Sequence, residues 1–96
     1  MKKMHLLLVV FVLFSFLLSG CYYFSANTEI KNAEKLVAEL KAAGGAKSVP
    51  YEYCSAEGFL ASSKIEFTQG DYKPAKELAG RSVSAAQAGL AEVKKK

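Results

Sequence analysis

Between residues 28 and 93, apolar residues recur at alternating spacings of three and four, which is the period of an α-helix. The pattern is interrupted by the pair Gly44 and Gly45, by Pro50 and by Gly70. Glycine and proline end helices readily, and no run of useful length alternates with the period of a β-strand. The sequence therefore predicts an all-α domain of three helices.

Capping residues and helix breakers suggest where each helix begins and ends. Asn27 or Thr28 can cap the first helix, which should end at the glycine pair. Pro50 suits the first position of a second helix, Gly70 its end, and Asp71 the N-cap of a third. The stripes expected to form the core are Ile30, Ala33, Leu36, Val37 and Leu40; Tyr53, Ala56, Leu60, Ser63 and Phe67; and Ala75, Leu78, Ala79, Ser82, Val83, Ala86, Leu90 and Val93.

The turn Gly70, Asp71, Tyr72 is short enough to make the second and third helices antiparallel, which predicts a helical hairpin. The small residues of the third helix should let its partner approach closely. Only 14 of the 76 residues from position 21 onward are Ile, Leu, Val or Phe, and another 14 are Ala. So thin a core indicates a fold that is marginal alone, or one completed by a partner or by self-association.

The N-terminus has the form of an export signal. Lys2 and Lys3 precede a run of 13 residues, 6–18, that only Ser15 interrupts, shorter than the roughly 20 residues of a membrane-spanning helix. The sequence Leu18-Ser19-Gly20-Cys21 that follows resembles a bacterial lipobox. At such sites the chain is cut between the positions of Gly20 and Cys21, and the cysteine receives diacylglycerol and a fatty acid such as palmitate. An ordinary secretory signal with a chance cysteine is the alternative.

Two or three acyl chains would hold a small domain on a membrane, because each buried methylene contributes about 0.8 kcal/mol. The expected organisation is a lipoprotein signal peptide at 1–20, a lipid-anchored tether at 21–27, a helical domain at 28–93 and a basic tail at 94–96. Tyr22 follows the cysteine where inner-membrane lipoproteins tend to have aspartate, which favours the outer membrane facing the periplasm, or the plasma membrane in a cell without one. The aromatic residues at 22–24 would either lie in the lipid interface or belong to a mobile tether.

The hairpin elements resemble a known family. Its pattern is similar to Tyr53, Ala56, Glu57, Leu60, Phe67, Gly70, Asp71, Tyr72, Ala75, Leu78 and Ala79, within a match over about residues 27–92. The chain thus resembles the short helical lipoproteins of the DUF4398 type, a domain of unknown function. The resemblance implies a tetratricopeptide-like hairpin and an envelope location but no activity. An OmpA-like peptidoglycan-binding domain follows this module in some members; none follows Val93 here, so that role is not carried over.

The chain from Cys21 onward contains few groups suited to catalysis. The only histidine, His5, precedes the expected cut, so neither a Ser-His or Cys-His pair nor a histidine metal ligand is expected. Asp71 would need a second carboxyl group to act as a catalytic pair, and a helix cap is the simpler interpretation. Eleven basic and nine acidic residues give a net charge of only +2 after position 20, which argues against nucleic acid. No enzyme, metal or cofactor beyond the lipid is expected.

Cys54 and the C-terminal lysines leave alternatives open. Cys54 would remain as a lone thiol in an oxidising compartment, either buried as a small apolar residue, the preferred interpretation, or paired with a second chain. Tyr53 and Tyr72 fit core or turn packing with their hydroxyls in water, and Tyr51 is less constrained. Lys94–Lys96 form either a frayed solubilising end or a contact for anionic headgroups or wall polymers.

These features predict a non-enzymatic envelope lipoprotein that acts as a scaffold or accessory module for another envelope protein. The alternative is a structural tether or binder of the peptidoglycan layer, suggested by a lipid at one end and lysines at the other. Glycine and proline, however, break the long helix typical of wall-linked lipoproteins.

Overall fold

The computed structural model describes residues 2–96, apart from the side chains of residues 15–20. Its elements are α1 (Lys2–Ala42), the single turn α2 (Gly45–Ser48), α3 (Pro50–Thr68) and α4 (Tyr72–Lys95). Every regular element of the described chain is a helix, so the predicted all-α class is confirmed.

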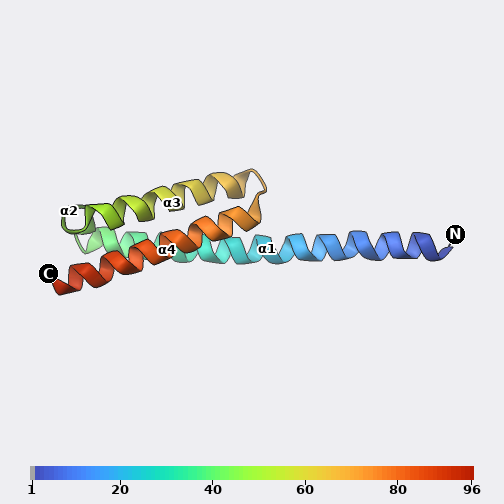
Figure 1. Cartoon of the computed structure of the whole chain (residues 1–96), viewed down its shortest axis with the longest axis horizontal. Coiled ribbons are helices and arrows are strands. Elements are labelled where there is room, and N and C mark those ends of the chain that lie inside the picture. The colour runs from blue at the N-terminus through green and yellow to red at the C-terminus, as the bar shows by residue number, and fades with distance from the viewer. Residues whose placement is uncertain (1) are drawn as a thin grey trace.

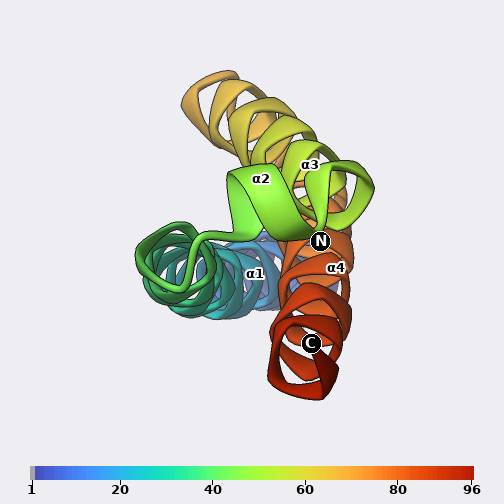
Figure 2. The same ribbon diagram turned by 90° about the vertical axis from the view of Figure 1, so that its left-hand side faces the viewer.

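The C-terminal half of α1 forms a bundle with α3 and α4, while the N-terminal part of α1 projects beyond it (Figure 1). Helix α4 packs against both α1 and α3, whereas α1 and α3 contact each other much less. Seen from the end that holds α2 and the C-terminus, α2 connects α1 to α3 (Figure 2). The projecting helix accounts for the elongated shape, 69 Å along its longest axis.

The predicted start of the first helix is wrong. Helix α1 passes through Asn27 and Thr28 without a break, so residues 21–27 are helical instead of forming a tether. Extending an existing helix costs far less than nucleating one, and Asn and Thr are disfavoured inside a helix by only about 0.7 kcal/mol or less. Burial also begins earlier than predicted, because Ala26 is fully buried one turn before Ile30.

The other boundaries largely follow the prediction. Gly44 and Gly70 adopt φ angles of 81° and 83°, a region that glycine enters at little cost, and they follow the ends of α1 and α3. Pro50 opens α3 in the first turn, as predicted. The turn α2 was not predicted; it fills the short segment between the glycine pair and Pro50.

The core contains the predicted stripes. Of the predicted positions, Leu36, Leu60, Phe67, Leu78, Leu90 and Val93 are only partly buried, and the rest are buried. Val49, beside the start of α3, is an additional buried residue.

Two serines connect α3 and α4 along their interface. Ser63 Oγ donates a hydrogen bond of 2.6 Å to the Ala75 carbonyl, and Ser82 Oγ donates one of 2.6 Å to the Ala56 carbonyl. Both serines are fully buried. Their small side chains allow the two helices to approach, and the reciprocal bonds satisfy the hydroxyls that this approach buries.

Leu40 fills the end of the bundle near α2. It is fully buried, and it fits there because two neighbouring residues are glycines. A Cβ atom on Gly89 would lie 2.9 Å from Leu40 Cδ2 and 3.2 Å from Glu52 Cβ, and one on Gly45 would lie 2.6 Å from Leu40 Cγ. The leucine therefore occupies a socket that α2 and α4 leave open.

We predict opposite effects for the same substitution at two helical glycines. Gly58→Ala places its methyl group in open space and should raise the free energy of unfolding by about 0.5–1 kcal/mol through helix propensity. Gly89→Ala gains the same propensity but crowds Leu40, and we expect a net loss of about 1 kcal/mol. Urea unfolding followed by circular dichroism measures both values. Equal stabilisation by the two variants would contradict the socket.

Candidate functional site

The predicted lipidation residue lies where the projecting part of α1 meets the bundle. Cys21 is exposed, and together with Tyr22, Ser25 and Lys76 of α4 it lines a shallow depression. Gly20, the predicted residue before the cut, belongs to the stretch 15–20, whose side chains lie outside the described residues. The side chain of Cys21 is thus exposed and lies close to α4 of the bundle.

Three aromatic rings from three helices meet beside Cys21. The ring centroids of Tyr23 in α1, Phe67 at the end of α3 and Tyr72 at the start of α4 are each 5.2 Å from the other two. Phe24 contacts Tyr23 edge-on at 5.6 Å. Such tilted and edge-to-face pairs stabilise by about 0.5–1.5 kcal/mol beyond their buried area. The alternative of a mobile tether is therefore wrong, because the helix after Cys21 is fixed to the α3–α4 turn.

The predicted role of Asp71 as a side-chain cap is also wrong. Asp71 occupies the N-cap position of α4, but its carboxyl group makes no capping hydrogen bond. The carboxyl group instead faces Glu66 of α3. A hydrogen bond with Asp71, followed by burial and by charge repulsion from Asp71, raises the pKa of Glu66 above its ordinary value. The backbone closes the turn, since the Asp71 N–H donates to the Glu66 carbonyl at 2.9 Å and the Ala75 N–H to the Asp71 carbonyl at 3.1 Å.

Cys54 is exposed, so the prediction that it is buried is wrong. Successive helical residues are rotated by about 100°, and this turns Cys54 out of the core that Tyr53 faces. The thiol borders a shallow groove formed with Gly58, Phe59 and Leu78, among others. The disulfide to a second chain stays a prediction.

Tyr53 packs in the core, as predicted, but its hydroxyl group also has a hydrogen-bond partner within the protein. It donates a hydrogen bond of 2.6 Å to Glu57 Oε1, one turn along α3. This bond is the main cause of a raised pKa for Tyr53. Tyr72 packs at the turn as predicted, whereas Tyr51 is 78 % exposed at the start of α3.

The C-terminal lysines lie at the end of α4 (Figure 1), whereas Cys21 lies beside Lys76 near the start of that helix. Lys96 Nζ donates a hydrogen bond to the Ser48 carbonyl of α2, and Lys95 forms a salt bridge of 3.6 Å with Glu92. Lys94 is exposed. The tail therefore contacts α2 instead of extending freely.

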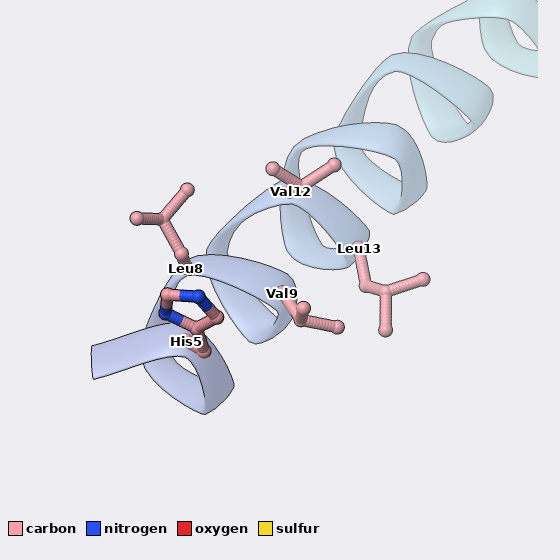
Figure 3. A pocket seen from close by; sticks show the side chains of 5 residues that line it. All are labelled: His5, Leu8, Val9, Val12 and Leu13. Carbon is pink, nitrogen blue, oxygen red and sulfur yellow. The ribbon is translucent and has the colours of Figure 1, made fainter. Parts of the chain in front are cut away.

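The projecting part of α1 presents apolar side chains to its surroundings. Leu8, Val9, Val12 and Leu13 extend from one side of the helix beside His5, with exposures between 45 % and 64 % (Figure 3). Within the described part of the chain, no helix combines the length and apolarity needed to cross a bilayer. The described residues also include no group of three or more His, Cys, Asp and Glu side chains placed to hold a metal ion.

Sequence reasoning missed the contact of Tyr23 with the α3–α4 turn and the proximity of Lys76 to Cys21. Extending the apolar stripe upstream from Ile30 to Ala26 would have indicated that the packed face of α1 begins before Asn27. It would not have identified the residues of α3 and α4 that lie opposite. No family model matches the chain, and no curated protein or solved structure matches it significantly.

The Glu66–Asp71 pair predicts a pH-dependent stability. Because the pKa of Glu66 is higher in the folded state than the ordinary 4.5, the folded chain holds this proton more tightly than the unfolded chain does. The pair's contribution is therefore most favourable below pH 4.5 and is lost as the pH rises through the folded-state pKa. Asp71→Asn removes the repulsion yet keeps a hydrogen-bonding group and a good N-cap residue.

We expect Asp71→Asn to raise the melting temperature at pH 7 and to leave it nearly unchanged at pH 4. Thermal unfolding at the two pH values measures this, with Glu77→Gln on the exposed surface of α4 as the control. A variant that melts lower than the wild type at pH 7 would show that the two carboxyl groups do not oppose each other.

Proposed function

We propose that this chain is a bacterial lipoprotein whose helical bundle serves as a non-enzymatic interaction module in the periplasm. Diacylglycerol and a fatty acid on Cys21 hold it in the outer membrane, or in the plasma membrane of a cell without one. The observation that carries this proposal is the position of Cys21, an exposed thiol between a projecting apolar helix and a packed bundle. Removing residues 1–20 would leave the packed part of α1 intact.

The outward face of α3 supports a role in protein contacts. One stripe of exposed, uncharged residues follows helical spacing, with the charged Glu57 and Lys64 at its Ala61 edge: Tyr51, Cys54, Gly58, Ala61 and Ile65. Tyr51 is 78 % and Ile65 56 % exposed, and the small residues between them would let another helix approach. The partner is an envelope protein or a second copy, which Cys54 could then link.

The resemblance to DUF4398-type lipoproteins belongs to this proposal. It implies a hairpin built around Gly70, Asp71 and Tyr72, and α3 and α4 with the turn between them have that form. The family carries no activity, so the proposed role rests on the anchor and the exposed face.

A second candidate function is a link between the membrane and the peptidoglycan layer. The observation in its favour is the distance along α4 between the proposed lipidation site and the lysine tail, because Cys21 lies beside Lys76 near the start of α4 and Lys94–Lys96 lie at its end. Sacculi boiled in detergent and digested with lysozyme should then release the protein with a muropeptide on a C-terminal lysine. Its absence from that fraction would remove this candidate.

Metabolic labelling with a fatty acid tests the anchor. The wild type should be labelled, and Cys21→Ser should lose the label and stay uncut between Gly20 and residue 21. Cys54→Ser is the matched control, because Cys54 is also an exposed free thiol and would take up any nonspecific acylation. Label retained in Cys21→Ser and lost in Cys54→Ser would overturn the assignment.

Affinity purification from detergent-solubilised membranes tests the interaction face. The tagged wild type should recover an envelope partner or an untagged copy, and Tyr51→Ser combined with Ile65→Ser should lose it. Exposed Lys73 and Glu77 on α4 provide the control, changed together to Ser. Recovery of the tagged chain alone, as a stable monomer, would refute the interaction module.

A further inference from the structure

The end of the bundle next to Cys21, here called the proximal end, combines two segments: the first turn after the predicted cut, Cys21–Phe24, and the α3–α4 turn, residues 69–71. The aromatic contacts of Tyr23 with Phe67 and Tyr72 hold these segments together. Phe24 lies one turn after Cys21 and therefore on a similar face of α1. Phe24 is 70 % exposed, and Tyr22 is 39 % exposed.

The formal charges around the α3–α4 turn balance. Two basic residues, Lys73 and Lys76 at the start of α4, lie near the turn in sequence, as do two acidic ones, Glu66 and Asp71. The exposed features that remain are aromatic, and aromatic rings are the side chains that concentrate at the level of lipid headgroups. The proximal end thus fits a bilayer surface better than a strongly charged ligand.

Helix α1 determines how the bundle is oriented relative to a membrane at the proximal end. No break occurs between Cys21 and Ala42, so 22 residues form a rigid rod about 33 Å long at 1.5 Å per residue. Helix α4 packs along this rod, and α2 and the C-terminal residues lie at its far end (Figure 1). An anchor at Cys21 followed directly by a packed helix restricts how the bundle can tilt.

We propose that the proximal end rests on the bilayer once Cys21 is acylated, with the rings of Phe24 and Tyr22 among the lipid headgroups and the far end of the bundle held away from the membrane. The inference rests on the proposed lipidation of Cys21 and adds a second membrane contact and an orientation. It also places the start of α3, with Tyr51, far from the lipid surface and accessible to other envelope components.

Tryptophan fluorescence tests this directly, because the chain contains no tryptophan. Phe24→Trp reports on the proximal end, and Tyr51→Trp is the matched control at the far end, since both positions are well exposed. Each acylated variant, purified in detergent, is reconstituted into phosphatidylcholine vesicles with brominated acyl chains. Bromine should lower the fluorescence of Phe24→Trp about twofold or more and leave Tyr51→Trp unchanged.

Two further readings make the result decisive. Tyr22→Trp should be quenched like Phe24→Trp, and neither added anionic lipid nor high salt should change the quenching, because the local charges cancel. Equal quenching at positions 24 and 51, or a shielded but unquenched tryptophan at 24 that indicates a protein cover, would overturn the orientation. Fatty-acid label on the same samples separates the two proposals: label without selective quenching refutes only the orientation, and missing label refutes the lipoprotein itself.

Discussion

The close approach of α4 to its neighbours depends on how little side-chain volume α4 carries. Its buried residues are Ala75, Ala79, Ser82, Val83, Ala86 and Gly89. Because α4 has few bulky side chains to bury, close contacts between the helices stabilise the bundle. The serine hydroxyls donate hydrogen bonds to carbonyl groups of the facing helix, and Leu40 enters the space left at Gly89. A single added methyl group at such an interface has few ways to be accommodated.

The continuity of α1 connects this packing to Cys21, the proposed site of the membrane anchor. A helix that merely followed a tether would leave the bundle free to rotate about the lipids. Because α1 is helical at Cys21 and Tyr23 contacts the α3–α4 turn, the proposed anchor at Cys21 would fix the orientation of the whole bundle. The proposed envelope role then needs no catalytic chemistry, since the protein would act by where it presents the outward face of α3.

Some features of the site were unexpected because they arise between helices. Glu66 and Asp71 are five residues apart on either side of a turn, and only the backbone reversal at Gly70 brings their carboxyl groups together. Cys54 was mispredicted for a local reason. Its neighbour Tyr53 is buried, yet the helical rotation between two successive residues is enough to expose the thiol. An apolar stripe predicts which face is buried but gives a poor estimate of how wide that face is.

The sequence by itself determined the helical class, the core stripes, the breaks at Gly44, Pro50 and Gly70, and the predicted lipobox. These follow from local physics, because helical periodicity and the conformations of glycine and proline act over a few residues. Only the tertiary structure decided the true start of α1, the ring contacts beside Cys21, the Leu40 socket and the exposure of Cys54. Each of these depends on which surfaces face one another, and residues distant in sequence meet only after the helices have packed.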